Sequence, residues 1–168
     1  MKKAVSIILV LSFLFLRASC IKHDKYGTYQ KDIDVIYIEH GGFDMQTSEY
    51  KIDLKEKKFY QYISKGFETH IPRDKSAENE GFSFVSDLDE ENIATFIRSS
   101  ARYGFTKWKD KYDDPNVEDG HQWGIRIVFA DGTEKQVYGS NKYPQTYEKM
   151  ADAFQQLTDT KILWTNGL

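Results

Sequence analysis

The sequence predicts an α+β fold: a single domain with a mainly antiparallel sheet of about five strands and two helices packed on one face. Three observations lead to this prediction. The chain has 168 residues, a length that suits one hydrophobic core. Several short runs of β-branched and aromatic residues alternate with polar residues at the period of a strand. Two longer segments, which follow residues 87 and 144, repeat their apolar residues at the period of a helix instead.

The first 19 residues predict an export signal. Lys2 and Lys3 form a cationic start, and residues 4–16 are apolar except for two serines. Thirteen residues make a helix of roughly 20 Å, which is shorter than the ~30 Å hydrocarbon core of a bilayer. We therefore expect residues 1–19 to be a cleaved signal peptide and not a membrane-spanning anchor.

The single cysteine of the chain, Cys20, directly follows the small residues Ala18 and Ser19. This arrangement resembles the lipobox of bacterial lipoproteins, in which the cysteine thiol is alkylated with diacylglycerol and becomes the first residue of the mature protein. The family prefers a branched aliphatic residue three positions before the cysteine, where this chain has Arg17. The resemblance implies attachment through Cys20 to a membrane of the bacterial cell envelope. An ordinary signal peptide, cleaved near Ala18, is the alternative.

Residues 20–32 are polar and lack periodicity, so we expect a tether there and the globular domain over 33–168. The formal net charge of the whole chain is −3, and three of its cations, Lys2, Lys3 and Arg17, belong to the leader. The mature protein is therefore more acidic still. Because an acidic surface repels phosphate backbones, we do not expect nucleic acid as a partner.

The strands are predicted in the order in which the alternating runs occur. Residues 33–38 form a β-branched and aromatic run that ends at two glycines, which is typical of a strand followed by a turn. In residues 49–63, apolar and charged positions alternate on both sides of a charged loop, which predicts a hairpin. A long polar loop is expected over 64–80, and a short strand over 81–85.

The first helix is predicted between a cap at Asp87 and a stop at Gly104. Asp87 and Glu90 have the spacing of a capping box, and an acidic first turn suits the helix dipole. Gly104 is the residue type that most often ends a helix. The apolar face of this helix is expected to contain Ile93, Phe96, Ile97 and Ala101.

A second hairpin is predicted over residues 124–137, and its register depends on the loop. A two-residue turn at Asp131 and Gly132 would place Ile125 opposite Tyr138. A three-residue loop with Gly132 in the left-handed conformation places Ile125 opposite Val137. We favour the second register because it keeps the apolar side chains on one face.

The second helix is the clearest amphipathic segment of the sequence. Pro144 suits its first turn, because proline at that position loses no helical hydrogen bond. The expected apolar face consists of Tyr147, Met150, Ala151, Phe154 and Leu157.

The sequence contains no established catalytic, phosphate-binding or metal-binding signature. Its four histidines, His23, His40, His70 and His121, have no pair at ligand spacing, and each is predicted to be a solvated surface residue. Glu39 and His40 could form an acid/base pair, but neighbouring residues of a strand point to opposite faces. We therefore predict no catalytic residue and no cofactor.

An acidic loop that contains five carboxylates within ten residues is a candidate cation site. Its spacing does not match a calcium loop of the EF-hand type, so a solvated loop without a metal is predicted. The carboxylates concerned are Asp110, Asp113, Asp114, Glu118 and Asp119.

Residues 119–157 resemble a recurrent pattern of small uncharacterised bacterial proteins and lipoproteins. The pattern contains two Asp-Gly pairs, a strand with a tryptophan, and a Tyr-Pro that opens a helix. The resemblance implies no activity, and core packing is the favoured role for its aromatic residues. The alternative is a groove for a sugar or a peptide lined by Trp123, Tyr138, Asn141 and Tyr143.

The functional prediction is a non-catalytic lipoprotein of the cell envelope that binds or interacts through its domain. Its expected partners are the membrane, through the lipid, and a protein or glycan. One alternative is an envelope hydrolase that pairs a carboxylate with His40 or His121. The other is an inhibitor or immunity-type protein with one tight basic partner.

Overall fold

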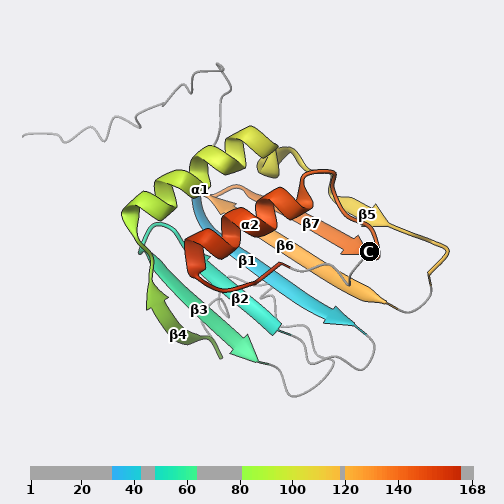
Figure 1. Cartoon of the computed structure of the whole chain (residues 1–168), viewed down its shortest axis with the longest axis horizontal. Coiled ribbons are helices and arrows are strands. Elements are labelled where there is room, and N and C mark those ends of the chain that lie inside the picture. The colour runs from blue at the N-terminus through green and yellow to red at the C-terminus, as the bar shows by residue number, and fades with distance from the viewer. Residues whose placement is uncertain (1–31, 43–47, 64–80, 118–119, 164–168) are drawn as a thin grey trace, which may run out of the picture.

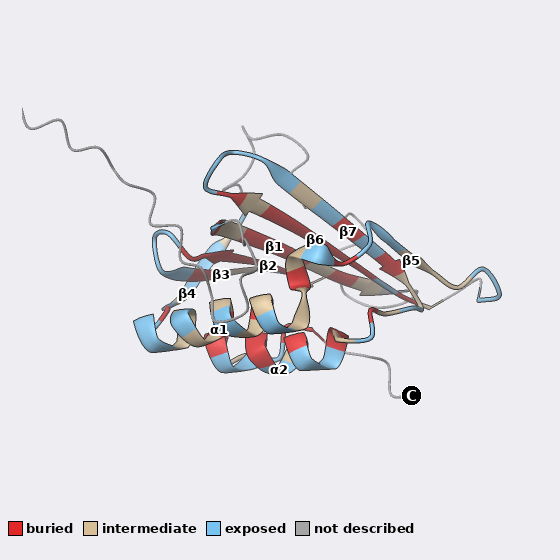
Figure 2. Ribbon diagram, turned by 90° about the horizontal axis from the view of Figure 1, so that it is seen from above, coloured by how far each residue is buried: buried red, intermediate tan, exposed pale blue. Residues whose placement is uncertain are grey.

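The computed structural model describes residues 32–42, 48–63, 81–117 and 120–163. The predicted leader, Cys20, most of the tether and the predicted 64–80 loop lie outside these residues. The described residues form one seven-stranded sheet, and two helices cover one of its faces (Figures 1 and 2). The elements are β1 Ile33–Gly42, β2 Ser48–Asp53, β3 Lys58–Ile63, β4 Ser83–Asp87, α1 Glu90–Tyr103, the 3₁₀ turn η2 Phe105–Lys107, β5 Lys111–Asp113, β6 His121–Phe129, β7 Glu134–Ser140 and α2 Tyr147–Thr158.

The α+β class with two helices is confirmed, but the sheet has seven strands and is mixed. The strand order is β4-β3-β2-β1-β6-β7-β5, and only β5 is parallel to its neighbour, β7. β5 was not predicted because its three residues are too few to show an alternating pattern. It is a strand because the backbone hydrogen bonds of β7 continue onto Asp110 and Asp114. None of the described helices is long and apolar enough to cross a membrane.

The central strand β1 organises the core, because it pairs with both β2 and β6. Ile36 lies opposite Ile52 on one side and Ile127 on the other. All three side chains have no exposed surface. They form the part of the sheet that the helices cover.

The register predicted for the second hairpin is confirmed. Ile125 lies opposite Val137, and the loop contains three residues, of which Gly132 has a φ of 78°. The Phe129 N–H donates to the carbonyl of Thr133 at 2.9 Å and closes this loop.

The first helix begins two residues later than predicted. Its cap is Asp89, whose side chain accepts hydrogen bonds from the backbone N–H groups of Glu91 and Asn92. Asp87, the predicted cap, is instead the last residue of β4. The chain stays extended because the Leu88 N–H continues the pairing with β3 by donating to the Lys57 carbonyl at 2.8 Å. The predicted stop at Gly104 is confirmed, with a φ of 65°.

The second helix also begins later than predicted, at Tyr147. Pro144 precedes it in a turn, in which the Pro144 carbonyl accepts from the Tyr147 N–H at 3.0 Å. Thr146 occupies the cap position, but its hydroxyl is engaged elsewhere. It donates to the Tyr103 carbonyl and accepts from the Trp108 indole, which ties the start of α2 to the segment after α1.

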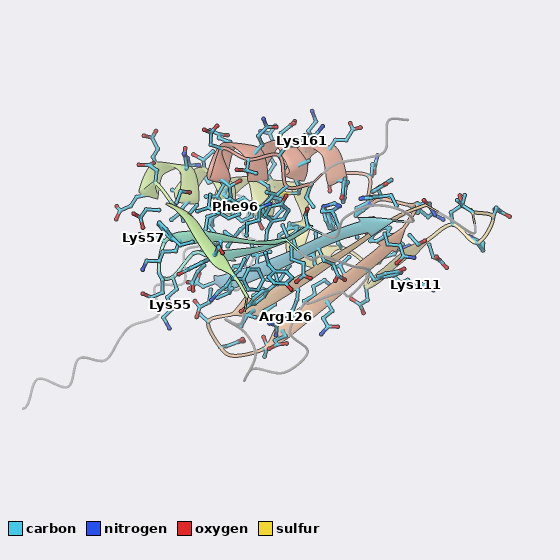
Figure 3. The ribbon with its side chains drawn as sticks, turned by 90° about the horizontal axis from the view of Figure 1, so that it is seen from below. Lys55, Lys57, Phe96, Lys111, Arg126 and Lys161 are labelled. Atoms are coloured by element: carbon cyan, nitrogen blue, oxygen red, sulfur yellow. The ribbon has the colours of Figure 1, made fainter. Side chains whose placement is uncertain are left out.

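Three phenylalanines join the helices to each other above the sheet. The ring of Phe154, on α2, lies 4.7 Å from that of Phe96 on α1 and 5.5 Å from that of Phe105 in η2. None of the three is more than 1% exposed. Figure 3 shows Phe96 between the helices and the sheet, whereas Arg126 lies on the other face of the sheet.

That other face carries charged side chains that are nevertheless buried. The guanidinium of Arg126 lies 4.3 Å from the centre of the Tyr37 ring and 3.4 Å from a carboxylate oxygen of Glu134. The cation is therefore held by an aromatic ring and an opposite charge, as a buried cation requires. The two faces of the sheet differ in chemistry, and the apolar one supplies the core.

Candidate functional site

A polar cluster lies in the core at the end of the sheet where β1 finishes and β6 begins. His40 and His121 are each only 1% exposed, so the prediction that they are solvated is wrong. His40 shares the core face of β1 with Ile36 and Ile38, and His121 shares that of β6 with Trp123, because alternate residues of a strand point to the same face. His23 and His70 lie outside the described residues.

The two imidazoles form a hydrogen-bonded chain with a tyrosine. His40 Nδ1 lies 2.8 Å from His121 Nε2, and His121 Nδ1 lies 2.9 Å from the hydroxyl of Tyr143. The rings of the two histidines stack at 4.9 Å. Asn141 aligns the start of β6, since its side-chain oxygen accepts from the His121 N–H at 2.9 Å. These hydrogen bonds connect the buried His40 to the half-buried phenol of Tyr143 through His121.

Both histidines are held neutral by their surroundings. Burial lowers the pKa of His40 to about 3, with a further contribution from the adjacent His121. Burial also lowers the pKa of His121. Two neutral rings can share one proton along the 2.8 Å contact, whereas protonation of both would place one N–H against another.

Neither histidine is arranged with Glu39 as an acid/base pair. Glu39 lies on the face opposite to His40, where a side chain at Gly124 would collide with its carboxylate. This agrees with the expectation from strand geometry. Both ring nitrogens of His121, and Nδ1 of His40, face an imidazole or a phenol instead.

The buried histidines predict a loss of stability in mild acid. Their pKa values in the folded state lie below the unfolded value near 6.5, so the unfolded chain binds more protons between those limits. The free energy of unfolding should fall as the pH drops below about 6.5, by up to about 1.4 kcal/mol per pH unit for each histidine. Urea unfolding at pH 7.5, 6.0 and 5.0 would measure this slope. His40→Asn should be less stable at pH 7.5 but have a shallower slope, and equal slopes for both proteins would contradict the prediction.

The structure does not bring the four candidate ligand residues of the sequence together. Trp123 is 1% exposed, and a side chain at Gly139 would collide with its ring, so Trp123 is a core residue. Tyr138 is 38% exposed and lies on the face opposite to Trp123. Asn141 adopts a φ of 54° in the turn after β7 and bonds to His121. Tyr143 lines a groove of the described structure.

This groove has a volume of about 410 Å³ and lies between the segment 109–113 and the loop after β7. Three lysines and one aspartate face it, so its charge is opposite to that of the whole chain. Sequence reasoning missed the lysines and Tyr112, although the alternation of lysine with aromatic residues after residue 106 was a usable signal. The residues that line the groove are Lys109, Lys111, Tyr112, Asp113, Lys142 and Tyr143.

The aromatic rings of the groove are held in place from behind. Tyr112 accepts a hydrogen bond from the Lys109 N–H at 3.0 Å, and Tyr143 is bonded to His121. Both rings stack against buried Trp123, at 6.0 Å and 6.1 Å between centroids. The Trp123 indole in turn donates to the Lys142 carbonyl at 3.1 Å. The groove therefore combines a rigid aromatic wall with three lysines.

The described carboxylates of the acidic loop are engaged by protein groups. Asp110 pairs with Lys135 at 2.8 Å and Asp113 with Lys111 at 3.2 Å. Asp114 accepts from the Asn116 N–H at 3.1 Å. Glu118 and Asp119 lie outside the described residues. Within the described ranges, no group of three or more His, Cys, Asp or Glu residues is placed to hold a metal ion.

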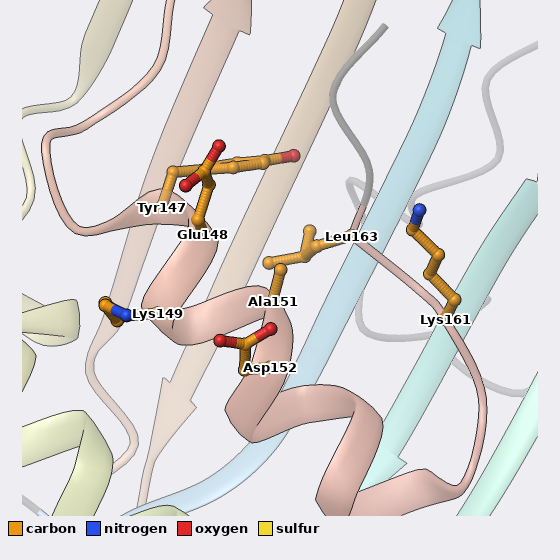
Figure 4. A pocket seen from close by; sticks show the side chains of 7 residues that line it. All are labelled: Tyr147, Glu148, Lys149, Ala151, Asp152, Lys161 and Leu163. Carbon is orange, nitrogen blue, oxygen red and sulfur yellow. The ribbon is translucent and has the colours of Figure 1, made fainter. Parts of the chain in front are cut away.

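A second hollow lies beside the start of α2 and is shown in Figure 4. It is smaller, about 230 Å³, and two acidic and two basic residues balance its charge. Figure 4 shows the Tyr147 side chain, which ends in its hydroxyl, extending from the start of α2. That hydroxyl is buried without a hydrogen-bond partner in the described structure, and its burial raises the pKa of Tyr147. The larger groove carries a net positive charge, whereas the charges of the smaller hollow balance.

No protein-family model matches the chain, and neither the curated proteins nor the solved structures include a significant match. A function for this protein therefore has to be inferred from the chemistry of its own residues.

Proposed function

We propose that this protein is an exported lipoprotein whose domain binds a component of the bacterial cell envelope without transforming it. The observation that carries the binding role is the groove beside β5, where a pre-positioned aromatic wall meets three lysines. The leader and the lipobox resemblance at Cys20 support the location.

Rigidity of the groove favours binding. Ordering a side chain on association costs free energy, and rings that are already held do not incur that cost again. Tyr112 and Tyr143 are held by hydrogen bonds at their hydroxyls and by Trp123 behind their rings. A ligand can therefore use their surfaces directly.

The state of the histidines favours a role without catalysis. A general base must reach its substrate and must titrate near the working pH. His40 and His121 are both 1% exposed and hydrogen-bonded within the core, and burial lowers the pKa of each. Their arrangement supports Tyr143 from behind instead of presenting a reactive nitrogen to the groove.

The tether is short enough to keep the domain at the membrane. If Cys20 carries the lipid, thirteen residues precede the start of β1 at Ile33. A flexible chain of that length spans roughly 20 Å on average. The groove would then face polymers and headgroups that lie within a few nanometres of the bilayer.

Binding without turnover can be tested with isolated cell-wall sacculi and the full-length protein in detergent. We expect the protein to sediment with the sacculi and the polymer to be recovered unchanged by mass spectrometry. Tyr112→Ala should weaken this association about tenfold, because truncating an aromatic contact often has an effect of that size. Phe84→Ala is the matched control, since Phe84 is an exposed aromatic residue of β4, at the edge of the sheet opposite to β5.

Two results would contradict the proposal. Release of soluble fragments that stops in His121→Gln would favour the hydrolase alternative. Failure to sediment, together with capture of one tight basic protein, would favour the inhibitor or immunity-type alternative.

A further inference from the structure

We propose that the groove binds an anionic saccharide, a sugar ring that carries a carboxylate or a phosphate. This inference rests on the proposed binding function and names the class of ligand. It follows from two features of the groove, its local charge and the nature of its wall.

The net charge of the groove is opposite in sign to that of the whole protein. The chain carries a formal net charge of −3, yet three of the four charged residues that line the groove are lysines. Lys111 is paired with Asp113 at 3.2 Å. Lys109 and Lys142 are exposed and form no ion pair within the described part of the chain. Two ammonium groups are thus available to an anion, which would be repelled elsewhere on this acidic protein.

Lysine suits either of the two anionic groups. Its ammonium is a compact charge on a flexible stem and does not require the paired geometry of an arginine fork. Carboxylate and phosphate both accept charge-assisted hydrogen bonds from it. The groove therefore specifies the sign of the ligand's charge more strongly than the identity of its acid.

The aromatic wall indicates a sugar in place of a bare anion. Tyr112 and Tyr143 are both half-buried and line the groove with rings that Trp123 supports. The aliphatic face of a sugar ring packs well on an aromatic ring, whereas an inorganic anion gains nothing from it. Hydroxyl groups of the sugar would remain near the rim, where water and lysines can satisfy them.

A lipid headgroup shares the anionic chemistry but fits the groove less well. Membrane-surface sites combine cations with apolar side chains that enter the acyl region. The rim of this groove is charged on the β5 side, at Lys109, Lys111 and Asp113. The lining of the groove therefore favours an anionic saccharide over a lipid headgroup as its ligand.

The inference can be tested by NMR titration of the full-length protein in micelles with two matched pairs of sugars. N-acetylmuramic acid differs from N-acetylglucosamine by a carboxylate-bearing group, and glucose 6-phosphate differs from glucose by a phosphate. We expect at least one charged sugar to bind about fivefold more tightly than its neutral counterpart, with shifts at Tyr112 and Tyr143. Raising the NaCl concentration to 1 M should remove most of that preference.

Lysine variants connect this preference to the groove. Lys109→Gln combined with Lys142→Gln should reduce the affinity for the charged sugar to that for the neutral one. Lys149→Gln, on the exposed surface of α2, is the matched control and should change neither affinity. Melting temperatures of all variants should stay near that of the wild type, since these lysines are exposed.

The outcomes separate this inference from the function on which it rests. Equal binding of charged and neutral sugars would overturn the anionic class and leave a sugar-binding protein. Shifts at the groove with phosphatidylglycerol vesicles, tested on Cys20→Ser and without any sugar response, would overturn it in favour of a headgroup. Binding of sacculi without any sugar response would also overturn it, while failure of both experiments would overturn the proposed function as well.

Discussion

Replacing Cys20 by serine should abolish lipid labelling of the protein and end its stable attachment to the membrane. The proposed reason is that the Cys20 thiol carries a diacylglycerol and its freed amine a further acyl chain. Each buried CH₂ contributes about 0.8 kcal/mol, so two or three chains make attachment effectively permanent. The variant should appear either as an uncleaved precursor or as a released domain. Growth with a labelled fatty acid, detergent partitioning and intact mass measure these three properties.

Arg17 provides the companion variant for this experiment. Arg17→Leu restores the aliphatic residue that the lipoprotein family prefers three positions before the cysteine, so labelling should be unchanged or increased. If the wild type and Cys20→Ser have the same detergent partitioning and the mass expected for simple cleavage, the protein is an ordinary secreted one. The groove and its proposed ligand would be unaffected by that result.

Replacing Phe154 by alanine should lower the free energy of unfolding by roughly 3 to 5 kcal/mol. Phe154 has no exposed surface, and its ring packs against Phe96 and Phe105. Removing it leaves a cavity where α1, α2 and the turn after α1 meet, and the rigid aromatic neighbours cannot collapse into the space. Urea unfolding followed by circular dichroism would measure the loss.

Gln155→Ala serves as the control for this measurement. Gln155 is the exposed neighbour of Phe154 on α2, and alanine is a good helix former, so its stability should stay within about 0.5 kcal/mol of the wild type. A Phe154→Ala protein as stable as this control would show that α2 does not hold the core together.

Features that depend on neighbours along the chain could be predicted from local sequence patterns. A β-branched and aromatic run located the central strand, and period-two alternation located both hairpins. The 3.6-residue period located the faces of α1 and α2. Even the register of Ile125 with Val137 could be predicted, because a hairpin loop links strand pairing directly to local turn geometry. Of the groove, only Tyr143 was among the predicted ligand residues.

Which distant segments meet depends on strand pairing and packing, and no local pattern contains that information. His40 and His121 are 81 positions apart, and each alone resembles a surface histidine. They are buried together because β1 pairs with β6, which places both on the core face at the same end of the sheet. Likewise, the cap of α1 is Asp89 and not Asp87, because the backbone of Leu88 continues the pairing of β4 with β3 at Lys57. The spacing of apolar residues in the sequence indicates which face of a helix or strand is apolar. Strand order and packing determine which residues that face contacts.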